Sequence, residues 1–472
     1  MKKQRLFLLV AILFGCMQLN AQKQNLTGVW KIQVPHGILA MDVSNDSKKI
    51  VTGGLSNQLT VWELATGKKL IELKGHTDNI VSVRFSPNGR YIVSGGVDKT
   101  IILWDAITGD IIRQKIDHGD YVRDLVFSPD SKSFASASWD GTAIIWDTFS
   151  GQRINTISSH NDNVTAVDFN FDGSELITGS GDHSICVWDT KTWAKKYEHK
   201  EHTDEVWDAR FSPNGRYIVS GAWDNMCRVW DIAAKKQVFR INAHVSDVWS
   251  TTFTPDQQLI VTGGGDNYVR VWDVTNGELV AESPEGMHNG SVESVAVSQD
   301  NKNIVSVDRN GNLVVWHLPT YEQRISAYTN RKYEEWSKKS QYEKQEEYIS
   351  RLEKKTDFIE DWKKEYQALS VNTFIKMTDW TNFQILGYDA EKSVFKLSSP
   401  YFGKVAVKVP NRDAEKFEQS FKSATFAEPT ISLTEKGFIL QKATIQLDPN
   451  SRKNYTISPL FDDELGEVIG KQ

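Results

Sequence analysis

The chain has 472 residues, and 55 Lys and Arg stand against 61 Asp and Glu, for a formal net charge of −6. This balance leaves no basic surplus of the kind used to bind nucleic acid or an anionic membrane surface. The length exceeds what one hydrophobic core normally serves, so two or three structural units are expected.

The N-terminus has the pattern of a secretory signal. Three basic residues within positions 2–5 precede the apolar run 6–14, and the polar stretch that follows ends at Ala21. A charged head, a short apolar run and a small residue are typical of a cleaved signal peptide. We therefore expect residues 1–21 to direct export, to the periplasm or cell surface of a bacterium, with a eukaryotic secreted protein as an open alternative. Cys16 leaves a lipid anchor open as well, because the residues before it resemble a bacterial acylation box.

Seven tryptophans divide the next part of the chain into a repeat. They are Trp62, Trp104, Trp146, Trp188, Trp230, Trp272 and Trp316; the first six are 42 residues apart and the last interval is 44. A fixed period of this size indicates a repeat architecture. Within the unit 76–115, turn residues separate four short strand-like segments, at 80–85, 91–94, 100–104 and 110–115. Four short antiparallel strands in each unit predict the blades of a β-propeller.

Five of the units share a four-point pattern, in which a His is followed by a Ser or Thr, an Asp and a Trp at constant spacing. The sets are His76, Ser94, Asp98 and Trp104; His118, Ser136, Asp140 and Trp146; His160, Thr178, Asp182 and Trp188; His202, Ser220, Asp224 and Trp230; His244, Thr262, Asp266 and Trp272. This pattern resembles the WD-repeat propeller family over residues 26–326. The resemblance implies that each set forms a hydrogen-bonded structural chain inside its blade, where a buried Asp finds donors.

The first and last units depart from the pattern. Ser56 stands in the Asp position of the first unit and Asn310 in that of the seventh, so we expect these two blades to be the weaker ones. The ring must also join its ends, because an open ring exposes strand edges. The segment 29–34 is expected to add the outer strand of the seventh blade, with 322–326 as the alternative donor.

The chain shows no recognisable catalytic or metal-binding pattern. Seven of the ten His residues occupy the repeated position, and the spacing of His183, His199 and His317 matches no metal site. There is no phosphate-binding loop and no activated nucleophile motif, so we predict no catalytic residues, no metal and no cofactor. Cys186 and Cys227 would point to opposite faces of their strands, which argues against a disulfide.

Some positions vary between the units and remain near one end of the blades, where they are free to serve a partner. They hold Tyr121, Arg123, Trp139, Trp207, Trp223, Trp249, Glu205 and Asp247. The resemblance to WD repeats implies that these positions lie on or near the narrow top face. Tyr, Trp and Arg dominate binding hot spots, so we predict a surface there that binds a protein or peptide. The alternative, for Trp207 and Trp249 and also for Trp139 and Trp223, is that they pack between neighbouring blades.

The chain changes character after the seventh unit. Residues 327–370 mix charges of both signs with aromatics at helical spacing, which predicts a helical linker, either one long helix or a hairpin broken near Thr356. The absence of a sustained heptad favours a connector over a coiled-coil partner site. Residues 371–472 combine strand-like segments, a helix expected at 414–421 and a hairpin turning at 435–437, which predict a small α+β domain. We recognise no family there.

The predicted fold is therefore mainly β: a seven-bladed WD-repeat β-propeller over residues 22–326, the helical linker and the α+β domain. The predicted function is that of an exported, non-enzymatic scaffold that binds a protein or peptide, without nucleic acid and without a transmembrane span. Two other classes stay open. One is an envelope-anchored structural lipoprotein, and the other is an enzyme with its site in the propeller channel or in the C-terminal domain.

Overall fold

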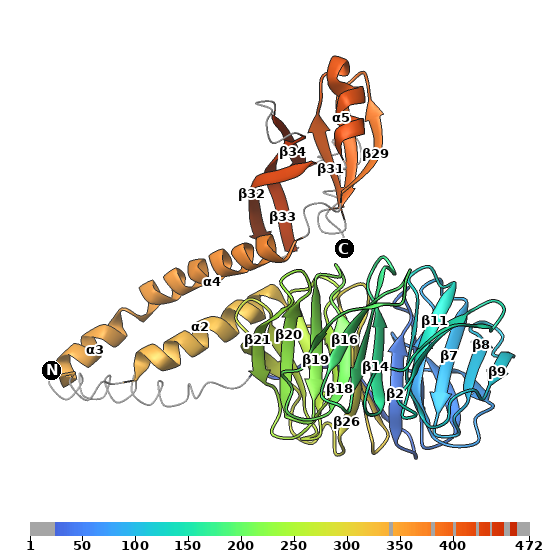
Figure 1. Ribbon diagram of the computed structural model, residues 1–472. Helices are drawn as coiled ribbons and strands as arrows, with labels where there is room; N and C mark the ends of the chain where they lie inside the picture. Colours follow the sequence, from blue (N-terminus) through green and yellow to red (C-terminus); the bar gives the residue numbers. More distant parts are fainter. Residues whose placement is uncertain are drawn as a thin grey trace.

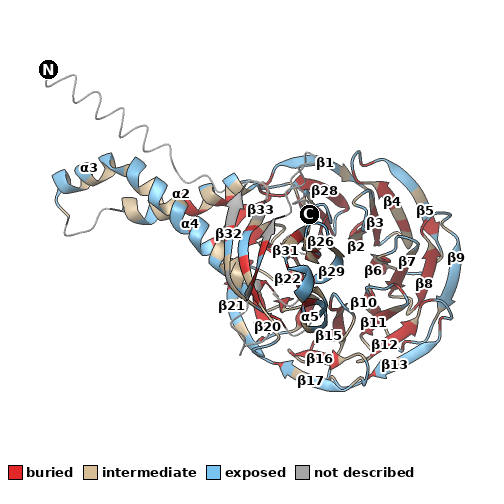
Figure 2. Cartoon of the chain, turned by 90° about the horizontal axis from the view of Figure 1, so that it is seen from above, coloured by how far each residue is buried: buried red, intermediate tan, exposed pale blue. Residues whose placement is uncertain are grey.

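A ring of seven four-stranded sheets forms the first and larger part of the protein. The computed structural model describes residues 24–338, 343–378, 383–399, 403–421, 424–434, 437–447 and 454–459. The predicted signal peptide and Cys16 lie outside these residues. Seen from above, the sheets are arranged around a central axis as the blades of a propeller (Figure 2). The predicted seven-bladed propeller, followed by helices and a small sheet domain, is confirmed.

Within blades 1 to 6, the strands follow one another in sequence from the axis outward. Blades 1 to 3 consist of β2 (Ile38–Val43), β3 (Lys49–Gly54), β4 (Gln58–Glu63) and β5 (Lys69–Lys74); β6 (Ile80–Phe85), β7 (Tyr91–Gly96), β8 (Ile101–Asp105) and β9 (Ile111–Lys115); β10 (Val122–Phe127), β11 (Ser133–Ser138), β12 (Ala143–Asp147) and β13 (Arg153–Ile157). Blades 4 to 6 consist of β14 (Val164–Phe169), β15 (Glu175–Ser180), β16 (Ile185–Asp189) and β17 (Lys195–His199); β18 (Val206–Phe211), β19 (Tyr217–Ala222), β20 (Met226–Asp231) and β21 (Lys236–Asn242); β22 (Val248–Phe253), β23 (Leu259–Gly264), β24 (Val269–Asp273) and β25 (Leu279–Glu282).

The faces of the central strands hold neighbouring blades together. Strand β15 is buried along its whole length, whereas four of the five residues of the outermost strand β9 are exposed. Apolar side chains from facing sheets form seven clusters between the blades, and each cluster contains one of the seven repeated tryptophans. Full burial of an aliphatic or aromatic side chain contributes roughly 1.5–3 kcal/mol. The tryptophan period therefore marks the core of the ring.

The N-terminal strand closes the ring, as predicted. Blade 7 consists of β26 (Val292–Val297), β27 (Asn303–Asp308), β28 (Asn312–His317) and, as its outer strand, β1 (Gly28–Gln33). Strand β1 pairs antiparallel with β28, with Trp30 opposite Val315. Trp30 Nε1 also donates a hydrogen bond of 2.9 Å to the Leu64 carbonyl of blade 1. The first described strand thus joins the last blade to the first.

A helical hairpin follows the ring. Helix α2 (Tyr321–Ser337) begins before the predicted start of the linker and includes the segment 322–326, which is therefore not the closing strand. Helices α3 (Gln345–Glu353) and α4 (Lys355–Met377) return along α2. An ion pair of 3.0 Å between Lys332 of α2 and Glu365 of α4 links the two arms. The hairpin turns between the end of α2 and the start of α3, so the predicted hairpin break near Thr356 is wrong; the interruption at Lys354 separates α3 from α4 within the returning arm. Good helix formers on both sides of Lys354 leave no sequence signal for this interruption.

Polar contacts attach the hairpin to blades 5 and 6. The Tyr366 hydroxyl donates a hydrogen bond of 2.5 Å to Asp273 at the end of β24. Arg331 pairs with Glu278, and further contacts join Arg324 to Gln258 and Arg216 to the Lys376 carbonyl. All four propeller residues lie in the turns after the first or third strand of a blade or at the end of the third strand. The hairpin is therefore fixed to one end of the blades.

The C-terminal domain is a six-stranded sheet with a short helix. Its strand order is β29 (Gln384–Asp389), β30 (Val394–Ser399), β31 (Gly403–Lys408), β34 (Asn454–Pro459), β33 (Gly437–Gln446) and β32 (Thr425–Thr434). The short helices η1 (Asn411–Asp413) and α5 (Ala414–Ser420) lie between β31 and β32 in the chain. Phe417 of α5 packs on Phe395 and Tyr455 of the sheet, with ring centroids 4.8 and 5.0 Å apart. The predicted helix and hairpin are confirmed; strand β34 was not predicted.

Figure 1 shows the small domain beyond one face of the ring, at the end of the helical hairpin. Within the part of the chain that the structure describes, no helix has both the length and the apolar character needed to cross a bilayer.

Candidate interaction surface

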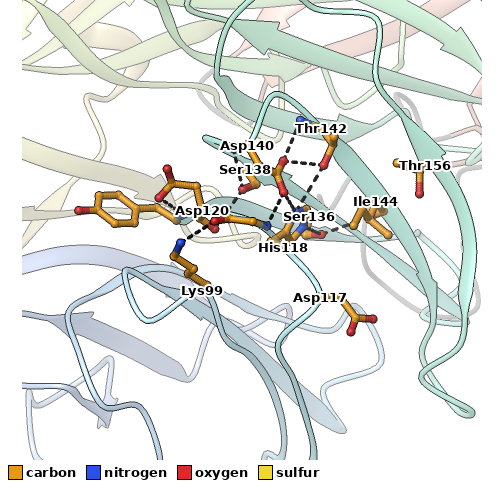
Figure 3. A network of polar contacts seen from close by, with 12 residues as sticks. Lys99, Asp117, His118, Asp120, Ser136, Ser138, Asp140, Thr142, Ile144 and Thr156 are labelled. Atoms are coloured by element: carbon orange, nitrogen blue, oxygen red, sulfur yellow. Dashed lines mark hydrogen bonds and ion pairs between the residues drawn. The ribbon is translucent and has the colours of Figure 1, made fainter.

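A chain of polar side chains runs through each of five blades. In blade 3, His118 Nδ1 lies 2.9 Å from the Asp140 carboxylate, and His118 Nε2 lies 2.7 Å from the Ser136 hydroxyl (Figure 3). The Ser136 hydroxyl also accepts a hydrogen bond of 2.8 Å from Trp146 Nε1. The Gly119 amide donates to Asp140 at 2.8 Å. Every member of the chain has a partner inside the blade, so this set has a structural role.

The same geometry recurs in blades 2, 4, 5 and 6, at the residues that the spacing singled out. The contacts from the His to the Ser or Thr are 2.7–2.8 Å, and those from the His to the Asp are 2.8–3.0 Å. Burial raises the pKa of the Asp98 carboxyl, but the hydrogen bonds from His76 and the Thr77 amide outweigh it and hold the pKa at about 2. Such a carboxylate is held as a charged acceptor, which suits structural support.

The prediction for blade 7 was wrong in one residue. His288 Nδ1 lies 2.9 Å from Asp308, not from Asn310, and its Nε2 lies 2.7 Å from Ser306. Asp308 ends β27, and its carboxylate accepts further hydrogen bonds from the Asn312 side chain and amide. An acid two residues earlier in the chain thus reaches the same point in space, and the chain of blade 7 is complete.

Blade 1 lacks the full chain, as its sequence indicates. Trp62 Nε1 donates a hydrogen bond of 2.9 Å to Thr52, but His36 is exposed on the surface. Ser56 bonds only to the carbonyl of Gln58. Blade 1 therefore relies on its apolar contacts and on the neighbouring Trp30.

A β-bulge near the start of the innermost strand recurs in all seven blades. The pairing register shifts across one residue in each strand, and these residues are Leu39, Val81, Arg123, Thr165, Trp207, Trp249 and Glu293. A bulge re-aims the side chain that it carries. All seven residues line one axial cavity. We call this set the bulge ring.

Charged side chains occupy the channel below the bulge ring. The Asp124 carboxylate pairs with Arg84 at 3.0 Å and with Arg210 at 2.9 Å, and Arg210 also pairs with Asp208 at 2.9 Å. Asp124 accepts a hydrogen bond from the Val167 amide of the next blade at 3.1 Å. The channel charges are thus engaged with one another and with neighbouring strands, as connectors between blades rather than as free acid–base groups.

Five aromatic rings from blades 3, 5 and 6 meet at the mouth of this channel. We call them the aromatic cap: Tyr121, Trp139, Trp207, Trp223 and Trp249. Trp207 stacks on Trp223 and meets Trp249 edge to face, with ring centroids 4.9 Å apart in both pairs. Tyr121 stacks on Trp139 at 5.0 Å, and Trp139 meets Trp207 at 6.4 Å. The Arg123 guanidinium lies 4.6 Å from the Trp207 ring centroid.

Backbone contacts explain why the predicted positions come together. The Trp139 amide donates to the Tyr121 carbonyl, and the Trp223 amide donates to the Glu205 carbonyl, each at 3.0 Å. In blade 6 the equivalent of Trp139 is Gly265. A Cβ atom there would lie 3.0 Å from Trp249 Nε1, so the missing side chain leaves the space that the indole occupies.

Trp207 of blade 5 and Trp249 of blade 6 meet edge to face, so the two residues make a contact between neighbouring blades, as the packing alternative expects, and they make it at the channel mouth. Trp207 is only 7% exposed, but neither residue belongs to an apolar cluster between blades, and both line the axial cavity. The indole N–H groups of Trp139, Trp207, Trp223 and Trp249 have no acceptor among the described residues. Buried polar groups in native proteins are nearly always paired, so four unpaired donors in one cluster are unusual.

Carboxylates border the aromatic cap. Glu205 and Asp247 are half-buried, and burial, followed by the charges of nearby acids, raises the pKa of each carboxyl. The nearby acids are Asp162 and Asp204 for Glu205, and Asp204 for Asp247. None of these four carboxylates forms an ion pair with a Lys or Arg of the described ranges. We call them the acidic rim.

Comparison with known proteins assigns the ring to a family. Residues 37–317 match the family model described as the IFT122 first beta-propeller. The chain belongs to this family. Pre-mRNA-processing factor 19 of Mus musculus and that of Rattus norvegicus are each 40% identical to it over 62 residues, which are 13% of this chain and 12% of each relative. The chain thus matches about an eighth of the length of these curated relatives.

Membership of the IFT122-type propeller family, together with the WD-type blades, indicates a protein-interaction scaffold. In this IFT122-type propeller, the helical hairpin contacts the turns after the first and third strands, at the end of the blades away from the aromatic cap. The cap and the acidic rim are therefore on the face that the hairpin leaves uncovered. No group of three or more metal-ligating side chains is found among the residues that the structure describes.

Proposed function

We propose that the protein is an exported, non-enzymatic scaffold that holds a protein or peptide partner at the aromatic cap. The observation that carries this proposal is the cap itself, in which rings from three blades meet, Arg123 lies over the Trp207 ring, and four indole N–H groups have no acceptor among the described residues. Aromatic and Arg side chains of this kind anchor partners at protein interfaces. Arg123, Trp207 and Trp249 lie on strands, and Tyr121, Trp139 and Trp223 directly adjoin strands, so binding orders little of the chain and costs little entropy.

Replacing Trp139 and Trp223 together by Ala is expected to abolish partner capture. Both side chains are half-buried and lie outside the clusters that join the blades, so the melting temperature should change little. Chemical crosslinking followed by affinity purification from the native cell envelope compares the variant with the wild type. Phe149→Ala is the matched control, because Phe149 is 85% exposed in a turn at the opposite end of blade 3. Undiminished capture by the double variant would overturn the proposal.

Export rests on the N-terminal pattern of basic, apolar and small residues. Mass spectrometry of the mature protein distinguishes the possibilities. Cleavage after Ala21 supports a free exported protein, a lipid on Cys16 supports anchoring in the envelope, and an intact N-terminus contradicts export.

A further inference from the structure

The acidic rim and the aromatic cap together have a defined electrostatic character. The charges of Asp162 and Asp204 act on Glu205, and that of Asp204 acts on Asp247. The Glu205 backbone is bonded to Trp223 of the cap, and no ion pair with a described Lys or Arg neutralises the four carboxylates. Their mutual repulsion is part of what raises the pKa of Glu205 and of Asp247. A positively charged group at the rim would remove this repulsion, whereas a phosphate or carboxylate would add to it.

The cap already accommodates one cation, and its own chain provides that cation. The Arg123 guanidinium lies over the Trp207 ring at 4.6 Å, the arrangement of a cation–π contact. The negative charges of Asp124, Glu293 and Asp208 act on the Arg123 guanidinium and offset its attraction for an anionic ligand. The remaining rings of Trp139, Trp223 and Trp249 are half-buried and present aromatic surface beside the rim.

The unpaired N–H donors indicate what else the ligand carries. Trp207 Nε1 and three further indole N–H groups have no acceptor in the described part of the chain, and Trp207 is more than nine-tenths buried. An unpaired buried donor is destabilising, and a carbonyl acceptor would relieve this cost. Peptide carbonyls are neutral acceptors that the acidic rim does not repel.

We propose that the aromatic cap recognises a peptide segment with a Lys or Arg side chain. The cationic end lies between the indole faces and the acidic rim, and the peptide carbonyls accept hydrogen bonds from the indoles. This inference rests on the proposed function, since it names the partner class for the same surface. It requires the rim carboxylates in addition to the aromatic rings.

The test uses blocked pentapeptides with one central Arg, Lys, Gln or Glu between glycines, titrated at up to millimolar concentration into the full-length protein. Quenching of tryptophan fluorescence and calorimetry measure binding. The Arg and Lys peptides should bind, with affinity that falls as salt rises, and the Gln and Glu peptides should bind at least about tenfold more weakly. Absence of binding by the Arg and Lys peptides, or preference for the Glu peptide, would overturn the inference.

The paired variant Glu205→Gln and Asp247→Asn should weaken binding of the Arg peptide about fivefold at low salt and leave the melting temperature unchanged. Asp110→Asn is the matched control, since Asp110 is exposed at the opposite end of blade 2. The same variant also separates the two proposals. Suppose that Glu205→Gln with Asp247→Asn captures the native partner fully and Trp139→Ala with Trp223→Ala does not. Then the inference of a peptide with Lys or Arg is wrong, and the proposal of a binding surface at the aromatic cap is supported.

Discussion

The guanidinium of Arg123 stacks on Trp207 although the two residues belong to blades 3 and 5, which are not neighbours. Blade 4 lies between them and contributes the small side chain of Thr165 at the equivalent bulge. The Thr165 hydroxyl donates a hydrogen bond of 2.5 Å to the Val206 carbonyl of blade 5, which holds this side chain against the neighbouring blade. The missing bulk in blade 4 lets side chains from both sides meet across the channel mouth. The cap is thus a product of differences between the blades.

The closing strand should contribute measurable stability through Trp30. Trp30→Ala removes a half-buried indole between blades 7 and 1 and its hydrogen bond to Leu64, so the free energy of unfolding should fall by about 2 kcal/mol. Chemical denaturation measures this change. Val29→Ala, in the same strand at a residue 41% exposed, should change it by less than about 0.5 kcal/mol. Equal effects of the two changes would show that β1 does not fasten the ring through Trp30.

Asp308 rather than Asn310 should stabilise blade 7. Asp308→Ala leaves His288 and Asn312 without their buried acceptor, so we expect a loss of about 2–3 kcal/mol in the free energy of unfolding. Asn310→Ala changes an exposed side chain and should cost less than about 1 kcal/mol. Thermal and denaturant unfolding of the two variants measures both losses. A larger loss for Asn310→Ala than for Asp308→Ala would show that Asn310, not Asp308, is the acceptor that stabilises blade 7.

Asp168 should make the ring less stable as the pH rises. Burial raises the pKa of this channel carboxyl from 3.8 to about 6, with the Asp124 charge adding to the effect and Arg210 and the Phe211 amide opposing it. A raised carboxyl pKa contributes stability that is present below the unfolded value and is lost as the pH passes the folded value. Asp168→Asn should therefore gain about 2–3 kcal/mol over wild type on going from about pH 4 to about pH 8.

Urea unfolding at the two pH values measures this gain. Asp110→Asn, an exposed acid, serves as the control. A difference between Asp168→Asn and wild type that stays constant with pH would mean that Asp168 ionises as freely in the folded ring as in the unfolded chain.

The ring could be predicted from the sequence because its period is set by one physical requirement. Each blade buries one tryptophan against its neighbour, so Trp104, Trp146 and the others recur at a fixed interval. Closure of the ring by β1 was predicted from the same repeat, because the segment 29–34 stands where a fourth strand stands in the other units. The acid of blade 7 was misassigned because spacing along the chain does not fix position in space: Asp308 ends β27, Asn310 follows in the turn, and it is Asp308 that faces His288.

The site was predicted only in part for a related reason. The sequence placed Arg123, Trp207 and Trp249 at varying positions near one end of the blades, but nothing in these residues signals the bulge that turns them toward the axis. Leu39, Val81, Thr165 and Glu293 complete the bulge ring and were not selected as site residues. A bulge repeated in every blade is a property of strand pairing, which single residues do not reveal.

Closure by β1 also has a consequence for biosynthesis. Trp30 leaves the ribosome early, but its partner strand around Val315 emerges only after six blades have been made. Until then the N-terminal segment has no sheet to join, and its final pairing must wait for nearly the whole ring. Contacts between such distant parts of a chain form slowly, so sealing of the ring should be the last and rate-determining event in its assembly.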